Sequence, residues 1–135
     1  MTPAQTPAAN IAFRLQARPA SAALLRERLE EWLEAQQVPE KERFDILLAT
    51  SEAFANAVEH PLRPAAAVVD VEGEIRAGTL ELTIRDYGAW RDEREREQGG
   101  LGFPLMRAVM QGVEVDSQSE GSTITLRRRL RSLPG

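Results

Sequence analysis

The chain has 135 residues, of which 42% are hydrophobic and 28% are charged, values typical of one soluble globular domain. It contains no cysteine and one histidine, which excludes disulfides, thiolate chemistry and zinc sites built from cysteine or several histidines. The net charge of −4 provides no basic footprint for nucleic acid. Neither a signal peptide nor an apolar run of about 18 residues indicates a membrane, so we expect a cytoplasmic protein.

The amino-terminal part of the chain predicts a leader, a strand and a helix. Residues 1–10 are rich in Pro, Ala and Thr and should form a flexible leader, so that one domain spans residues 11–131. Weakly alternating apolar residues predict a strand over residues 11–17. Pro19 suits the start of a helix, and Pro39 ends that helix. Four apolar residues at helical spacing form its expected buried side: Leu25, Leu29, Trp32 and Leu33.

A second helix is predicted from Glu40 to Pro61, and it has three distinct sides. Its polar side contains Glu52, Asn56 and His60, which recur at intervals of four residues. A column of small residues allows close approach to another surface: Ala49, Ala53 and Ala57. The main buried stripe is expected to consist of Phe44, Leu47, Leu48, Ser51, Ala55 and Val58.

The rest of the chain reads mainly as strands. Apolar residues alternate over residues 69–75 and 80–84, on either side of a turn at Ala77-Gly78. Residues 101–110 predict a short helix with Leu105, Met106 and Val109 inward, and residues 113–126 predict a closing hairpin. This order indicates an α+β two-layer sandwich, with a mixed, mostly antiparallel sheet and helices on one face. The basic run is expected to be solvated: Arg127, Arg128, Arg129 and Arg131.

Chemistry-bearing residues begin with the pair on the second helix. The amide oxygen of Asn56 can ligate Mg²⁺, and the carboxylate of Glu52 can accept a proton or position a water molecule. Both groups lie on one side of the helix, one turn apart. Taken alone, such a pair more often marks a solvated helix face.

Three later segments could bind a ligand. Asp86 closes an apolar strand two residues before Gly88, and its carboxylate can accept a hydrogen bond from an exocyclic amine such as that of adenine. The glycines of Gly99–Met106 precede a helix, whose amino end favours phosphate. Thr123 could add a hydroxyl group near the ligand. Each segment alone also fits a simpler structure: an Asp-x-Gly turn, a flexible loop and a hairpin residue.

Together these segments, in this order and spacing, resemble the asparagine box and the three glycine boxes of the GHKL ATPase superfamily, which includes gyrase and the histidine kinases. The segments LLATSEAFANAVEHP, DYGAW and GGLGFPLMRAVMQGVEV resemble more closely the anti-sigma-factor serine-protein kinases of bacterial partner-switching systems. The similarity extends over residues 17–130. It implies a Bergerat-type ATP-binding fold.

The resemblance also implies roles for individual residues. Asn56 corresponds to the Mg²⁺ ligand, Glu52 to the carboxylate that activates the attacking hydroxyl, and Asp86 to the residue that recognises adenine. Trp90 departs from the common Asp-x-Gly-x-Gly pattern, and the role of His60, which directly precedes a proline, stays open. The remaining implied nucleotide contacts are Gly88 after the aspartate, the lid residues Gly100, Leu101 and Gly102, and Thr123 behind the adenine pocket.

The function implied by the resemblance is that of a serine/threonine-protein kinase and anti-sigma factor. Such a protein binds ATP and Mg²⁺, phosphorylates a STAS-type antagonist and sequesters a sigma factor. The alternative is a non-catalytic ATP-binding module that docks partners. Residues 90–100, rich in charge and glycine, are expected to form a lid over the phosphates. No nucleic-acid or membrane partner is expected, and the sequence leaves open whether the chain forms a homodimer.

Overall fold

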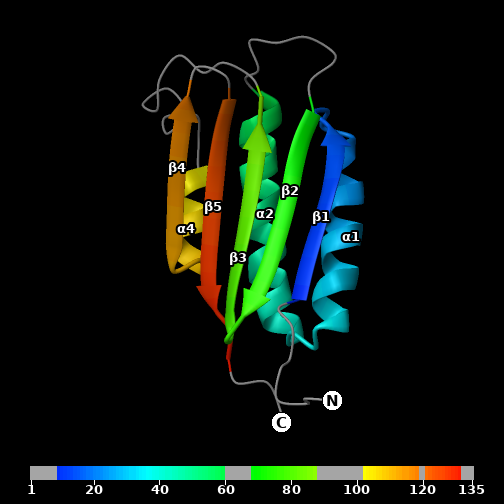
Figure 1. Ribbon diagram of the computed structural model, residues 1–135, viewed down its shortest axis with the longest axis vertical. Coiled ribbons are helices and arrows are strands. Elements are labelled where there is room, and N and C mark those ends of the chain that lie inside the picture. The colour runs from blue at the N-terminus through cyan, green and yellow to red at the C-terminus, as the bar shows by residue number, and fades with distance from the viewer. Residues whose placement is uncertain (1–8, 60–67, 88–101, 119–120, 132–135) are drawn as a thin grey trace, which may run out of the picture.

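The computed structural model describes residues 9–59, 68–87, 102–118 and 121–131, which form two layers (Figure 1). Five strands make one sheet, and the helices cover one of its faces. The predicted α+β sandwich is therefore confirmed. In chain order the elements are β1 (Ala9–Gln16), α1 (Ser21–Ala35), α2 (Glu40–Glu59), β2 (Val68–Arg76), β3 (Thr79–Asp86), α4 (Gly102–Val109), β4 (Gly112–Gln118) and β5 (Gly121–Arg129).

The sheet has the strand order β1-β2-β3-β5-β4, and every neighbouring pair is antiparallel. The described strands thus form an antiparallel sheet rather than a mixed one. The predicted turn between β2 and β3 is present, with φ of 51° at Ala77 and 78° at Gly78. Positive φ at both central residues is typical of a tight two-residue hairpin. The first strand begins at Ala9, inside the expected leader of residues 1–10.

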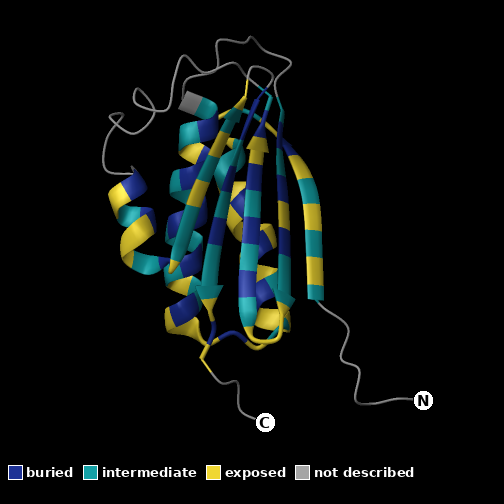
Figure 2. Ribbon diagram, turned by 60° about the vertical axis from the view of Figure 1, so that its left-hand side comes forward, coloured by how far each residue is buried: buried dark blue, intermediate teal, exposed yellow. Residues whose placement is uncertain are grey.

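Alternate residues of each strand point to opposite faces of the sheet, which we name the covered face and the open face (Figure 2). The covered face packs against the helices and carries most of the apolar residues. The open face carries no helix among the described residues and is mainly polar. The buried apolar residues of the covered face are Leu15, Val69, Val71, Leu80, Leu82, Ile84, Ile124 and Leu126.

Helix α2 crosses the middle of the covered face, and the side that it buries differs from the one expected. The expected main stripe is wrong at Phe44, which is 66% exposed, and at Ala55, which is also exposed, whereas Leu47 and Val58 are half-buried and pack against the core. The column of small residues is buried in its place, together with Ile46 and Phe54. Small side chains let the helix approach the sheet closely, and the large residues of the strands fill the space between the layers. The buried members of this column are Ala49, Ala53 and Ala57.

The basic run near the carboxyl terminus is only partly solvated. Arg128 points to the covered face, and its Nη1 donates to the carbonyl oxygen of Val109 at 2.7 Å and to Oδ2 of Asp45 at 3.0 Å. It therefore ties β5 to the end of α4 and to α2. The backbone N–H of Arg131 donates to the buried carboxylate of Glu42 at 2.9 Å. The expectation of a solvated run is wrong at Arg128, whose side chain is mostly buried by these partners, whereas the side chain of Arg131 is 75% exposed.

Helix α4 packs against α2 and β4. Met106 is buried as predicted, and Phe103 and Met110 are buried with it. Leu105 and Val109, both expected inward, are half-buried. In the described part of the chain, no helix has the length and apolar character that crossing a membrane requires.

Candidate functional site

The carboxyl-terminal turns of α2 and the end of β3 lie at the same end of the two layers (Figure 1). The two elements pack against each other, with α2 on the covered face. Most of the predicted site residues that the structure describes occur on these two elements. This end of the molecule is the candidate site.

Glu52 and Asn56 are both half-buried and lie one turn apart on α2. The side-chain Nδ2 of Asn56 donates a hydrogen bond of 3.2 Å to the main-chain carbonyl of Glu52. The helix itself thereby engages the donor end of the amide. The amide oxygen Oδ1 remains as the ligand-type atom, and oxygen is the atom that Mg²⁺ prefers. The local geometry thus suits Asn56 to hold a cation.

Asp86 lies on the covered face as the last residue of β3, and it is only 6% exposed. Its register partner on β5 is Ser122, which is 2% exposed, and the register partner of Ser122 on β4 is Ser117. The hydroxyl oxygen of Ser117 is buried and has no hydrogen-bond partner in the described part of the protein. These three residues form a polar row across one end of a mainly apolar face. A buried hydroxyl oxygen without a partner, such as that of Ser117, is costly, so this end of the face can accept a polar ligand.

Thr123 does not join this row. It follows Ser122 on β5 and therefore points to the open face, where its register partners are Arg85 and Asp116. The sheet places Ser122 beside Asp86 instead. Sequence reasoning missed Ser122, although counting back in twos from the buried Ile124 predicts that it shares the covered face.

Gly121 brings the start of β5 unusually close to the end of β3. It is buried and has φ of 152°, a backbone conformation that favours glycine. A Cβ at this position would overlap the carbonyl oxygen of Asp86 and would lie 3.0 Å from Cα of Tyr87. Gly121 therefore fixes where the peptide between Asp86 and Tyr87 runs. Gly121 falls within the predicted hairpin of residues 113–126, and the sequence pattern gives no sign of this close approach.

The remaining predicted residues lie near the amino end of α4 or outside the described residues. Gly102 is the first residue of α4. Gly88, Gly100, Leu101 and His60 lie outside the described residues, as does the expected lid of residues 90–100. Their predicted roles stay predictions.

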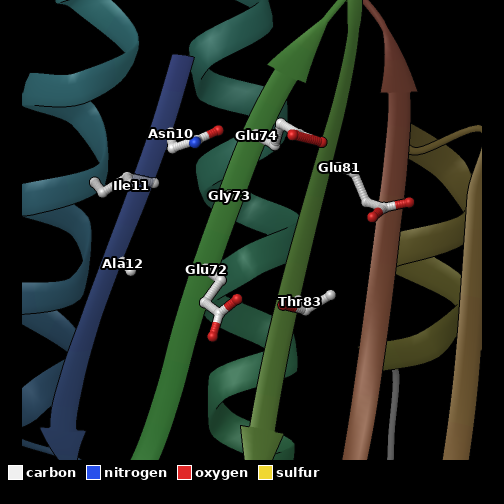
Figure 3. A pocket seen from close by; sticks show the side chains of 8 residues that line it. All are labelled: Asn10, Ile11, Ala12, Glu72, Gly73, Glu74, Glu81 and Thr83. Atoms are coloured by element: carbon white, nitrogen blue, oxygen red, sulfur yellow. The ribbon is translucent and has the colours of Figure 1, made fainter. Parts of the chain in front are cut away.

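A hollow of about 340 Å³ lies on the open face and is lined by residues of β1, β2 and β3 (Figure 3). Its lining includes three carboxylates, Glu72, Glu74 and Glu81, which would repel a triphosphate. A second hollow of about 660 Å³, lined in part by Glu114 and Asp116, is likewise acidic. Neither suits an anionic nucleotide, so charge favours the covered face. No group of three His, Cys, Asp or Glu residues suited to a metal occurs in the described ranges.

The open face beside Asp86 carries a hydrogen-bonded cluster. Arg14 of β1 donates from Nε to Oδ1 of Asp70 at 2.7 Å and from Nη2 to Oδ2 at 3.0 Å. The hydroxyl of Tyr87 donates to the same Oδ2, and the guanidinium carbon of Arg85 lies 5.1 Å from the centre of the Tyr87 ring. The bonds from Arg14 lower the pKa of Asp70, and the bond to Asp70 raises the pKa of Tyr87. The cluster thus favours an ionised Asp70 and a neutral Tyr87.

Comparison with known proteins identifies the family to which this chain is similar. A family model for the histidine kinase-like ATPase domain matches residues 15–128. The anti-sigma F factor of Halalkalibacterium halodurans is 32% identical over 103 residues, which cover 66% of this chain and 70% of that protein. The anti-sigma F factor of Clostridium kluyveri is 26% identical over 102 residues, which cover 66% of this chain and 72% of that protein.

A solved structure of the RsbU and RsbW domains of a Mycobacterium tuberculosis protein is similar in fold. It has a TM-score of 0.76 and 25% sequence identity, and it covers 94% of this chain. The match covers 34% of that longer chain, so this protein spans about a third of its length. These similarities confirm the predicted resemblance to the superfamily and to anti-sigma-factor proteins. The family model and the fold agree, and this chain belongs to the family of histidine kinase-like ATPase domains, which implies that it binds a nucleotide.

Proposed function

We propose that this chain is a Mg-ATP-dependent serine/threonine-protein kinase and anti-sigma factor. The observation that carries the proposal is the polar row led by Asp86, buried on the covered face at the end of the molecule where α2 presents Glu52 and Asn56. Its relatives are named anti-sigma F factor, which favours a partner-switching role. We propose that it acts on a STAS-type antagonist and sequesters a sigma factor.

The adenine end of the nucleotide is assigned to Asp86. Its buried carboxylate would accept a hydrogen bond from the exocyclic amine, which guanine does not offer at the same position. Ser122, rather than Thr123, stands beside it and would supply the hydroxyl group behind the base.

The phosphate end is assigned to α2. Asn56 offers Oδ1 to Mg²⁺ and keeps its Nδ2 on the carbonyl of Glu52, which orients the amide. When bound, Mg-ATP supplies the phosphoryl group to be transferred and the positive charge that offsets it. Glu52, which lies one helical turn before Asn56, would act as a general base and accept the proton of the substrate hydroxyl. The predicted contacts of Gly88, Gly100, Leu101 and Gly102 belong to the same proposal.

The decisive experiment separates binding from chemistry at Glu52. Glu52→Gln should keep ATP affinity within a few-fold, because the amide preserves shape and polarity. Phosphoryl transfer to a purified STAS-type antagonist should fall by roughly 10²-fold, the lower part of the range for general base catalysis, because the transition state is largely dissociative. Glu40→Gln, at the exposed start of the same helix, is the matched control and should change neither quantity.

Radiolabel transfer measured beside calorimetry with ATP and GTP gives both readouts. Unchanged transfer by Glu52→Gln would remove this residue from the mechanism. Absence of transfer by the wild type, with a cognate antagonist supplied, would favour the non-catalytic binding module. Asn56→Ala and Asp86→Ala should each weaken ATP binding, and undiminished binding by both would contradict the site assignment.

A further inference from the structure

The cluster on the open face, formed by Arg14, Asp70, Tyr87 and Arg85, lies directly behind the proposed adenine-binding residue. Tyr87 follows Asp86 in the chain, so the two residues share one peptide group. Asp86 points to the helices, whereas Tyr87 bonds to Asp70, a residue of the open face. The orientation of one side chain is thus linked to that of the other.

Asp86 lies at the very end of the paired part of β3. It forms the last register pair of β3 both with β2, opposite Val69, and with β5, opposite Ser122. The backbone pairing of both ladders stops after Asp86, and the end of a ladder frays more easily than its interior. The contact with Gly121 holds the following peptide within the sheet, and the bond from Tyr87 to Asp70 holds it from the open face.

We propose that Tyr87 is a positioning residue for the nucleotide site, held by Asp70 and Arg14, which sets the orientation of Asp86 toward the base. The inference rests on the proposed function, because it assigns to Asp86 the recognition of adenine. Arg14 fixes the carboxylate of Asp70 with two bonds, and that carboxylate receives the hydroxyl of Tyr87. Small displacements of a recognising group cost affinity out of proportion to their size.

Protonation and neighbouring charges agree with this arrangement. At neutral pH Asp70 is ionised and Tyr87 is neutral, because the cluster lowers the pKa of the first and raises the pKa of the second. Among the described residues, the charged groups that face the pair are Arg14 from β1 and Arg85 from β3, and both cations favour the ionised carboxylate. The hydrogen bond is therefore present over the range in which the protein would work.

The test uses Tyr87→Phe, which removes only the hydroxyl group. ATP affinity should fall about three- to tenfold, the effect of losing one hydrogen bond. GTP affinity should stay unchanged, because the proposed loss concerns recognition of the adenine amine. The melting temperature should change little. A purely structural role for Tyr87 would lower the melting temperature or reduce both affinities equally, so the ATP-to-GTP ratio separates the two explanations.

Two comparisons complete the experiment. Tyr87→Phe introduced into Asp86→Asn should cause no further loss of ATP affinity, because the residue through which Tyr87 acts has already been changed. Glu74→Gln is the matched control. Glu74 lies on β2, the strand that also carries Asp70, but away from Asp86. The substitution breaks the 2.8 Å ion pair between Glu74 and Arg76 and should leave nucleotide affinity unchanged.

Failure of the inference and failure of the proposed function give different results. If Asp86→Asn weakens ATP binding but Tyr87→Phe does not, the positioning role is overturned and the site assignment stands. An additional loss in the double variant would also overturn the positioning role. If Asp86→Asn itself binds ATP normally, both the inference and the adenine assignment fail.

Discussion

The covered and open faces of the sheet are built from alternate residues of the same strands, yet they are different environments. The covered face is mainly apolar, apart from Arg128 and, at one end, a row formed by the buried Asp86 and Ser122 and the half-buried Ser117. The open face is crowded with charges that largely neutralise one another, such as Arg127 between Glu81 and Glu114. A polar residue therefore supports different inferences on the two faces. On the open face it is ordinary surface, whereas on the covered face its burial calls for a ligand or a structural partner.

Two glycines with positive φ provide the largest expected contrast. Gly121→Ala would combine a strained backbone with a Cβ that overlaps Asp86, and should cost about 3 kcal/mol or more of stability as well as ATP affinity. Gly78→Ala, at a turn where a Cβ would meet nothing within 4 Å, should cost only about 1 kcal/mol and leave ATP binding intact. Urea unfolding and calorimetry measure both quantities. Equal effects of the two substitutions would contradict the close approach at Gly121.

Arg127 and Arg128 are consecutive residues on opposite faces and provide the next contrast. Arg128→Ala would leave the carboxylate of Asp45 and the carbonyl of Val109 without this partner in a partly buried place, and should cost about 2 kcal/mol. Arg127→Ala should have a much smaller effect, because its partners on the open face stay in contact with water. Thermal melting of the two variants, each checked for dispersed NMR signals, makes the comparison. A larger loss at Arg127 would reverse the assignment of the faces.

Ser122 and Thr123 sharpen the same comparison inside the candidate site. Ser122→Ala should weaken ATP binding about fivefold, because a hydroxyl beside Asp86 is lost. Thr123→Val, on the open face, preserves shape and should leave ATP affinity within experimental error. Calorimetry decides between them. If only Thr123→Val lost ATP affinity, the role behind the adenine pocket would belong to Thr123, as the family resemblance implies, and not to Ser122.

The smallest expected effect is the acid dependence of the open-face cluster. Asp70 has a pKa below its usual value of 3.8 in the folded protein, chiefly because Arg14 donates to it. A lowered folded pKa adds stability above the unfolded value, and this contribution disappears as the pH falls through the folded pKa. The difference in melting temperature between wild type and Asp70→Asn should therefore be constant from pH 5 to 8 and shrink below about 3.8. High salt should diminish it, and a difference that grows in acid would contradict the ion pair.

Most of the fold and the motif residues of the site follow from the sequence. The alternating strands, the two long helices and the Ala77-Gly78 turn were all predicted near their observed places, because apolar periodicity and turn preference depend on local backbone geometry. Glu52, Asn56 and Asp86 were identified by spacing and by resemblance. The structure brings α2 and the end of β3 to one end of the molecule.

Local sequence alone did not determine the orientation of α2 or the polar row. Helix α2 has two sides that could be buried. Its neighbours α1, α4 and the sheet bury the side that carries the alanines and leave Phe44 exposed to solvent. Likewise, the place of Ser122 beside Asp86, the close approach of Gly121 and the bond from Tyr87 to Asp70 depend on strand register. Register joins residues far apart in the chain, and a shift of one residue exchanges the two faces. Only the packed sheet decides which polar residues meet, because neither periodicity nor spacing contains that information.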